Sequence, residues 1–258
     1  MAEPRAGLRV GEWELGRALA TGTFAEVREA ASAAGQVIAI KRMHGHAARD
    51  PELRALFVAE CALTCALPPH PGLVRGLAAD PTAERPHLAM ELVAGPDLRT
   101  VLTDRAPSPA EARALIAGAA AAAAHLHAEG WVHGDLNPAN LLVGPAGPVI
   151  CDLGIARRVG EAGPVRGTAA YMAPEQVRGE PWTGAVDVFA LGVMLWELST
   201  GERLFHRGAS FLSMAAVIEH APAALADTAI SAPVAAALAA DPATRLSAAE
   251  LAAALAGR

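Results

Sequence analysis

The spacing of apolar positions changes about one third of the way along the chain. The first part contains short β-rich runs separated by turn signals, at Trp13–Leu19, Phe24–Ala30, Val37–Lys41, Leu73–Leu77 and His87–Leu92. One helix lies among them. Asp50 suits an N-cap, Pro51 suits the first helical position, and apolar residues then recur at helical spacing up to Leu67. This pattern predicts a small sheet with one helix.

After Gly95 the pattern becomes helical. Ser108–Glu111 (SPAE) is a capping box with proline at the first helical position, and it opens an alanine-rich helix expected to reach Gly130. Ala185–Thr200 is a strongly apolar helix that Gly201 would end. Two short strands and a last helix with a second capping box complete this part, at Leu141–Val143, Val149–Cys151 and Ser247–Glu250. The sequence predicts an α+β protein of two lobes with a linker near Leu92–Asp97.

The composition excludes several classes of protein. Apolar residues make up 53% of the 258 positions, and the formal net charge is −6. This charge argues against a general binder of nucleic acid or anionic membranes, which usually shows a basic face. The chain starts without an apolar signal core, and its apolar runs are too short for a membrane span. Cys61, Cys65 and Cys151 show no metal or disulfide spacing, so we expect buried free thiols in a reducing cytoplasm.

Two segments of the first part contain residues suited to a nucleotide. ATGTFAEV (Ala20–Val27) joins two strands through a turn of small residues around Gly22, where backbone N–H groups can approach an anion. Taken alone, it fits a plain hairpin turn better. In VIAIK (Val37–Lys41) side chains alternate, so Ala39 leaves room for a flat adenine on the face from which Lys41 can reach a phosphate. An ordinary edge-strand lysine is the alternative.

Glu60 lies on the apolar stripe of the predicted helix. A carboxylate that points into a core is costly unless it is paired. Lys41, nineteen residues upstream on a neighbouring predicted strand, is its natural partner. The alternative is a solvated charge at the margin of the stripe.

Two further acidic positions lie in the second part. Asp135 in HGDLNPAN stands five residues before Asn140, and Asp152 in DLG follows a short apolar strand seventeen residues after Asp135. A carboxylate at a strand end beside a flexible glycine suits a hard cation such as Mg²⁺. An acidic turn is the alternative for DLG.

Together with GTAAYMAPE (Gly167–Glu175), these motifs resemble the signature set of a Hanks-type (eukaryotic-like) bacterial serine/threonine protein kinase over residues 13–256. The resemblance implies a bilobal protein-kinase fold, with a small β-rich N-lobe (1–92), a hinge (93–97) and a larger helical C-lobe (98–258). It also implies a transferase that moves the γ-phosphoryl group of ATP, with Mg²⁺, to serine or threonine hydroxyls of protein substrates in signal transduction.

The resemblance also implies roles for individual residues. Asp135 would accept or orient the proton of the attacking hydroxyl, with Thr168 beside it. Asn140 and Asp152 would hold Mg²⁺. Asn137 stands where relatives usually have a lysine that contacts the transferring phosphoryl group.

Nucleotide-binding and scaffold roles follow in the same way. The residues implied to bind or enclose the nucleotide are Ala20, Gly22, Val27, Ala39, Lys41, Glu60, Met90, Glu91, Val93, Asp97 and Leu142. Asp187 would hold the backbone of the catalytic loop, and Glu175 would pair with Arg245.

The chain departs from the family pattern at positions that affect regulation and rate. Gly134 replaces an arginine that grips an activation-loop phosphate in many relatives, and residues 155–167 include no serine, threonine or tyrosine. We therefore expect no switching by phosphorylation within that segment. Asn137 brings no charge, and the loss of one preorganised donor costs about 10²–10³ in rate, which slows an enzyme without abolishing it.

A last departure concerns the helix that carries Glu60. Thr64 and Gly76 stand where the family usually packs larger apolar residues. A cavity or polar contact there would seat the helix poorly, so we expect an activating partner or a homodimer to complete it. A pseudokinase acting as a nucleotide-binding or scaffold module remains the alternative, because of Asn137 and two missing turn glycines. A small-molecule kinase is disfavoured by GTAAYMAPE.

Overall fold

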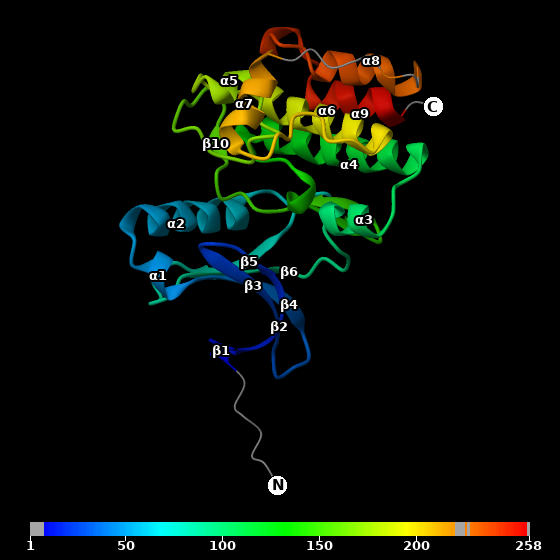
Figure 1. The fold of residues 1–258 in the computed structure, drawn as a ribbon. Helices are drawn as coiled ribbons and strands as arrows, with labels where there is room; N and C mark the ends of the chain where they lie inside the picture. The colour runs from blue at the N-terminus through cyan, green and yellow to red at the C-terminus, as the bar shows by residue number, and fades with distance from the viewer. Residues whose placement is uncertain (1–7, 220–224, 226–227, 257–258) are drawn as a thin grey trace. The chain divides into compact units, whose positions relative to one another are not determined.

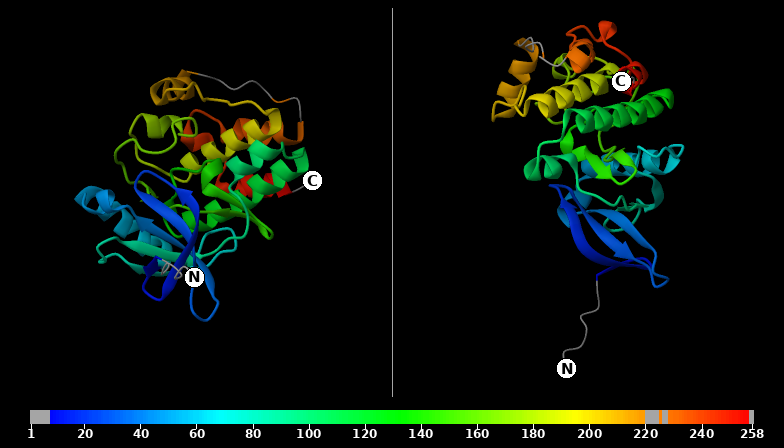
Figure 2. Two further views of the ribbon diagram at one scale, coloured as in Figure 1. Left: turned by 60° about the horizontal axis from the view of Figure 1, so that its bottom comes forward. Right: turned by 90° about the vertical axis from the view of Figure 1, so that its right-hand side faces the viewer.

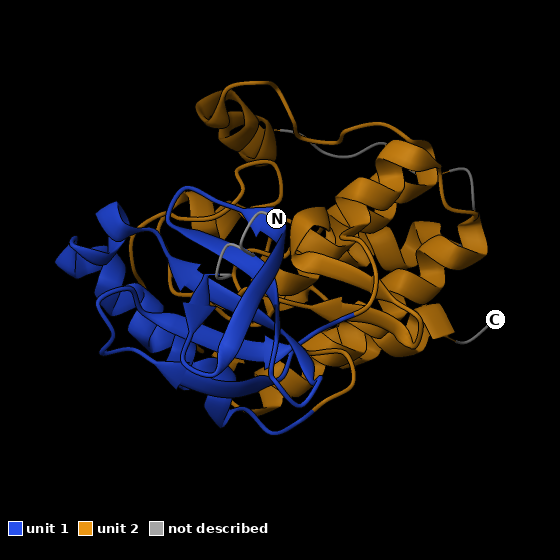
Figure 3. Ribbon diagram, turned by 90° about the horizontal axis from the view of Figure 1, so that it is seen from below, with its two compact units in different colours: residues 1–69, 74–93 blue, residues 70–73, 94–258 orange. Residues whose placement is uncertain are grey.

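The computed structural model describes residues 8–219, 225 and 228–256. The chain forms two compact units, which Figure 3 colours separately: the first holds residues 1–69 and 74–93, and the second holds residues 70–73 and 94–258. The first unit is built on a sheet and the second mostly on helices, which confirms the predicted α+β fold.

A six-stranded antiparallel sheet forms the first unit, in the order β1-β2-β3-β4-β6-β5 (Figure 1). Its strands are β1 (Arg9–Val10), β2 (Trp13–Thr21), β3 (Ala25–Ala31), β4 (Val37–Met43), β5 (Gly76–Asp80) and β6 (His87–Glu91). The strand expected from Leu73 begins only at Gly76, because Leu73 forms a bridge with Ile150 and belongs to the second unit.

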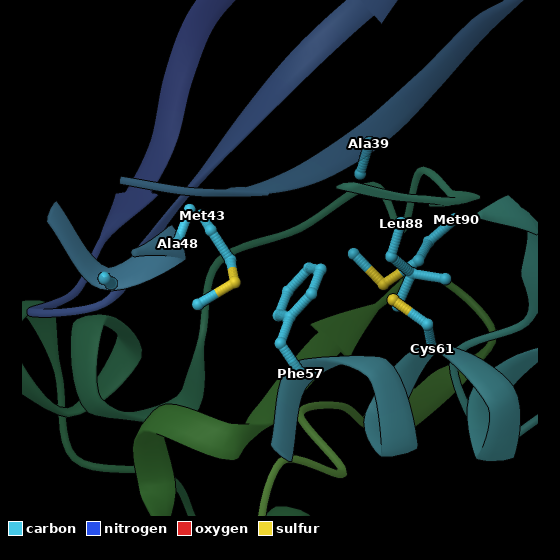
Figure 4. Close-up of a cluster of buried hydrophobic side chains, with 8 residues drawn as sticks. Ala39, Met43, Ala48, Phe57, Cys61, Leu88 and Met90 are labelled. Atoms are coloured by element: carbon cyan, nitrogen blue, oxygen red, sulfur yellow. The ribbon is translucent and has the colours of Figure 1, made fainter. Parts of the chain in front are cut away.

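Two helices accompany this sheet, α1 (Gly45–Ala48) and α2 (Pro51–Ala66). The predicted N-cap is confirmed, since the Asp50 carboxylate accepts the N–H groups of Glu52 and Leu53 at 2.9 and 3.1 Å. Side chains of α2 pack against β4 and β6 in a buried cluster (Figure 4), whose labelled members are Ala39, Met43, Ala48, Phe57, Cys61, Leu88 and Met90. The apolar stripe of α2 therefore faces the sheet, as its sequence spacing predicts.

The contact between α2 and β5 includes a buried polar side chain, Thr64, opposite a glycine, Gly76. The Thr64 side chain is buried and donates its hydroxyl to Glu60 O at 2.8 Å, which is a polar contact of the kind expected. A Cβ added to Gly76 would lie only 2.7 Å from Thr64 O and 2.9 Å from Cys65 N. Of the two expected alternatives, a cavity or a polar contact, the structure shows the polar contact, and the small residue at position 76 lets the strand and helix backbones approach each other closely.

Gly76→Ala should therefore destabilise the first unit by about 1–3 kcal/mol, the usual cost of overpacking, because every atom closest to the new methyl belongs to backbone. Urea denaturation measures the change. Gly45→Ala is the matched control, since its Cβ would meet nothing within 4 Å. Equal unfolding midpoints for the two variants would contradict this reading of the contact.

Helices dominate the second unit. They are α3 (Leu98–Asp104), α4 (Pro109–Ala128), α5 (Pro174–Val177), α6 (Ala185–Thr200), α7 (Ser210–Glu219), α8 (Thr228–Ala237) and α9 (Ala248–Ala256). α4 packs against α6 and α9 (Figure 2), and the buried face of α4 is largely alanine, which permits close approach. The capping box at Ser108 and Glu111 is present, and Gly201 ends α6 with a φ of 74°. Both predictions are confirmed.

Short elements of the second unit frame two loops that carry chemistry. They are β7 (Trp131–Val132), β8 (Leu141–Gly144), β9 (Gly147–Ile150), β10 (Arg157–Arg158) and two 3₁₀ turns, Pro138–Asn140 and Pro242–Thr244. The loop containing Asp135 runs from β7 to β8, and Asp152 follows β9, whose strand pairs with β8. The pairing of β8 with β9 therefore brings the two acidic segments together.

Two expectations from composition can be compared with the structure. Cys61 is buried, Cys151 is half-buried and Cys65 is exposed, so the expectation of buried thiols was wrong for Cys65, which lies near the end of α2. None of the described helices has the length and apolar character needed to cross a membrane.

Candidate active site

Lys41 and Glu60 form a buried ion pair in the first unit. Lys41 Nζ lies 2.5 Å from Glu60 Oε1, and the two side chains are 14% and 5% exposed. Lys41 is the only lysine of the chain, whose twenty other basic residues, histidine aside, are arginines. A compact ammonium and a planar guanidinium are not interchangeable at a buried site. The contact confirms the partner expected for Glu60.

One face of the sheet carries several predicted nucleotide-binding residues. Cross-strand partners lie on the same face, and Val27 pairs with Lys41 while Ala39 pairs with Met90. Ala39 and Lys41 are two residues apart on β4, so they share that face as well. Glu91, at the end of β6, is exposed and pairs with Arg75 at 3.2 Å. Val27, Ala39, Lys41 and Met90 are therefore brought together, as the sequence predicts.

The other residues implied to bind the nucleotide lie at the ends of strands and helices or in loops. Ala20 and Gly22 are exposed at the end of β2. Val93 is the last residue of the first unit. In the second unit Asp97 caps α3 by accepting the Thr100 N–H at 2.8 Å, and it forms a bridge with Leu142. Asp97 and Leu142 are therefore neighbours, whereas the contacts of all these residues with a nucleotide stay predictions.

Asp187 holds the backbone of the loop that contains Asp135. The Asp187 carboxylate is fully buried and accepts the N–H groups of His133 and Gly134, both at 2.8 Å. His127 Nε2 lies 2.8 Å from the same carboxylate. Burial by itself would raise the pKa of Asp187, but the hydrogen bond and charge of His127 and the loop N–H groups bring that pKa below its usual value. The scaffold role of Asp187 is confirmed, and His127 is a partner that sequence reasoning missed.

Asp135, Asn140 and Thr168 meet at the centre of the loop. Asp135 Oδ1 accepts the Thr168 N–H at 2.7 Å, and Asn140 Nδ2 donates to Asp135 O at 2.9 Å and to Asp135 Oδ2 at 3.2 Å. Burial raises the pKa of Asp135, against the hydrogen bond from Thr168, which lowers it. These contacts give the Asp135 side chain a fixed orientation.

Asn137 has its side chain directed back into the loop. Its Nδ2 donates to Asp135 O at 2.9 Å and to Thr168 Oγ1 at 3.1 Å, while its Oδ1 accepts the Ala139 N–H at 2.9 Å. The residue is buried. Both amide hydrogens are thus used inside the protein, in a direction that the sequence could not indicate.

Asn140 and Asp152 provide a donor set that suits Mg²⁺. Because both acceptors of Asn140 Nδ2 belong to Asp135, the amide orientation is fixed and Oδ1 is the atom left to bind a metal. Asp152 adopts a φ of 67°, and its Oδ1 accepts the Gly154 N–H at 3.2 Å. An amide oxygen and a carboxylate, with phosphate oxygens and water, are the ligands that Mg²⁺ prefers.

Trp182 occupies the space beside Gly134. Gly134 has a φ of 77°, and a Cβ there would lie 2.2 Å from the Trp182 ring. The Arg157 guanidinium stacks on the same ring at 3.7 Å and donates to Pro164 O at 2.6 Å. Both backbone conformation and packing therefore favour glycine at this position, and no sequence pattern links Gly134 to Trp182.

The segment after Thr168 is fixed by a second buried ion pair. Arg245 donates to both oxygens of Glu175, at 2.5 and 2.9 Å, and both side chains are at most 2% exposed. Next to it, Gln176 Nε2 donates to Gly134 O at 2.9 Å. The predicted pair is confirmed, and Gln176 adds a direct link from this segment to the catalytic loop.

A buried lysine–glutamate pair, and an aspartate followed five residues later by an asparagine, are features of phosphotransferases of the kinase type. The family model for the protein kinase domain matches residues 13–254. The chain belongs to the protein kinase family, and the resemblance derived from its motifs is confirmed.

Known relatives agree with this assignment. The chain is 39% identical over 218 residues to the serine/threonine-protein kinase PkaA of Streptomyces coelicolor. The aligned region covers 77% of this chain and 40% of PkaA. The chain is 38% identical to AfsK of the same organism, over 77% of this chain and 26% of AfsK. It is 36% identical to PknB of Mycolicibacterium smegmatis, over 75% of this chain and 33% of PknB. The matched region thus spans less than half the length of each relative.

Proposed function

We propose that this chain is a serine/threonine protein kinase domain that transfers the γ-phosphoryl group of Mg-ATP to protein hydroxyls. The observation that carries the proposal is the set of contacts around Asp135. Its carboxylate is fixed by Thr168 and Asn140, and burial raises its pKa. A base oriented in this way can take the proton of a serine or threonine hydroxyl as that oxygen attacks phosphorus.

Three further side chains would bind the nucleotide and its metal. Lys41, held by Glu60, would contact the phosphates, and Asn140 with Asp152 would hold the metal. Bound Mg²⁺ supplies charge neutralisation on the phosphate oxygens. The remaining contribution of the protein is to orient the hydroxyl and the phosphates, which accounts for most of the catalysis in this class of reaction.

Asn137 acts in this proposal as a positioning residue. Its contacts tie the Asp135 backbone to the Thr168 hydroxyl, so it holds the base in line without touching the phosphoryl group. The second candidate is a pseudokinase, because Asn137 supplies no cation two residues after Asp135.

The raised pKa of Asp135 predicts a measurable pH dependence. A base must be deprotonated to act, so kcat should fall as the pH drops through a pKa above the usual aspartate value of about 3.9. Thr168→Val removes the hydroxyl that lowers this pKa, and the acid limb of the kcat profile should move to higher pH. Thr168→Ser keeps the hydroxyl and should keep the limb. An acid limb that stays in place in Thr168→Val would contradict the assignment of Asp135 as the titrating base.

We further expect activity without phosphorylation of the activation segment. The ring of Trp182 lies beside Gly134, and the Arg157 guanidinium stacks on that ring. We expect this packing to hold residues 155–167 in place, a task that a bound phosphate performs in many relatives. Protein treated with phosphatase should keep the specific activity of untreated protein in a transfer assay. A loss of activity that returns with phosphorylation at Thr168 would contradict this expectation.

The test of the proposed function is transfer of labelled phosphate from Mg-ATP to a generic protein substrate, followed by identification of the modified amino acids. Label on serine or threonine is expected for wild type and should be lost in Lys41→Met. Arg49→Met, at an exposed basic position, is the matched control and should stay active. Stabilisation by nucleotide without any transfer would favour the pseudokinase.

A further inference from the structure

His44 makes two contacts with the turn between β2 and β3. Its backbone N–H donates to Phe24 O at 2.8 Å, and its ring Nε2 lies 3.1 Å from Gly22 O. A carbonyl oxygen can only accept, so Nε2 must carry a hydrogen. His44 is also the N-cap of α1, yet its side chain makes no capping bond. The ring therefore serves the turn and not the helix.

These contacts fix the direction of two peptide groups. In a trans peptide the C=O and the N–H point in opposite directions, and every described peptide is trans. With the carbonyls of Gly22 and Phe24 turned to His44, the N–H groups of Thr23 and Ala25 point away from it. The turn closes on itself through Gly22 N–H, which donates to Ala25 O at 2.9 Å. The Gly22 and Phe24 carbonyl oxygens, which would repel a phosphate, are thus directed to His44, and the Thr23 N–H is directed away from it.

The presence of glycine at position 22 indicates that a ligand approaches the backbone of the turn. Its φ lies outside the left-handed region, and the nearest atom to an added Cβ would be Ala25 O at 3.5 Å, which is ordinary contact. Neither backbone strain nor neighbouring protein atoms among the described residues therefore require glycine here. Close approach of an external group to the backbone would require it.

We propose that His44 is a positioning residue for the nucleotide: it holds the turn at residues 22–25 with N–H groups presented to the phosphates of ATP. The inference rests on the proposed function, since it assumes that ATP is the nucleotide. The turn has glycine only at position 22, with alanine at positions 20 and 25. The hydrogen bond from His44 Nε2 to Gly22 O would maintain its conformation from outside the turn.

The test compares the dissociation constants of ATP and adenosine, measured by titration calorimetry or thermal shift. Loss of a net hydrogen bond predicts an ATP affinity about 3- to 10-fold weaker in His44→Ala. The affinity for adenosine, which has no phosphates, should not change. His44→Gln retains a donor and should restore the affinity for ATP. His46→Ala is the matched control. The His46 ring stacks on His44 with ring centroids 5.7 Å apart, while the hydrogen bonds to Gly22 and Phe24 are made by His44.

Three results would overturn the inference. They are equal weakening of ATP and adenosine in His44→Ala, an unchanged ATP affinity in that variant, and a His44→Gln variant as weak as His44→Ala. Because binding is measured and not transfer, a wild-type chain that binds ATP without turnover would refute the proposed function while still testing His44.

Discussion

Asp135→Asn should lower kcat by about 10²- to 10⁴-fold, the usual contribution of a general base, without unfolding the second unit. The asparagine has the shape of the aspartate and can still accept the Thr168 N–H through its oxygen. It cannot accept a proton from a substrate hydroxyl. Asn140 would keep its hydrogen bond to the backbone carbonyl of residue 135. The expected result is a variant that binds Mg-ATP with nearly wild-type affinity and transfers phosphate very slowly.

Steady-state kinetics at saturating Mg-ATP measure this effect, and circular dichroism checks the fold. Asp104→Asn, at an exposed position at the end of α3, is the matched control and should leave kcat unchanged. A kcat for Asp135→Asn within a fewfold of wild type would mean that another group accepts the proton.

Arg245→Met should destabilise the second unit by about 3–5 kcal/mol, the usual cost of removing one partner of a buried ion pair. The change would leave the Glu175 carboxylate buried and unpaired. It would also remove hydrogen bonds to the carbonyls of Ala239, Ala185 and Ala240, at 2.7, 3.1 and 3.3 Å. These three hydrogen bonds are partly buried, so their loss adds to the cost.

Tryptophan fluorescence during urea denaturation reports on this unit, because Trp131, Trp182 and Trp196 lie in it. The additional replacement Glu175→Leu should recover part of the loss, since it removes the unpaired charge. Arg105→Met is the matched control: Arg105 pairs with Glu111 at 2.8 Å on the surface, with both side chains about half exposed, so its loss should be much smaller. Equal losses for the two arginine variants would contradict the account of the buried pair.

Some of these contacts could be predicted because their physical cost is visible in the sequence. A carboxylate on an apolar stripe needs a partner, which identified the pair of Glu60 with Lys41. Capping boxes and Gly201 gave helix ends within about two residues, the usual uncertainty of such boundaries. These features depend on local pattern or on one unavoidable charge.

Other contacts could not be predicted because they join residues that no pattern links. Trp182 packs on Gly134, and the ring of His44, just after β4, reaches the carbonyl of Gly22. Sequence spacing says nothing about such distances. At Thr64 the sequence left a cavity and a polar contact open for a related reason: small residues can be accommodated by a void or by closer packing, and sequence alone does not distinguish the two.

The most direct test of the central claim uses the single lysine of the chain. An acyl-phosphate derivative of ATP transfers its acyl group to an amine near the bound phosphates, and mass spectrometry locates the modification. If Lys41, Asn140 and Asp152 act on one Mg-ATP, Lys41 should be labelled, Mg-ATP should protect it, and Asp152→Asn should weaken that protection. A Lys41 that is not labelled, or protection by Mg-ATP that is the same in Asp152→Asn as in wild type, would contradict the account.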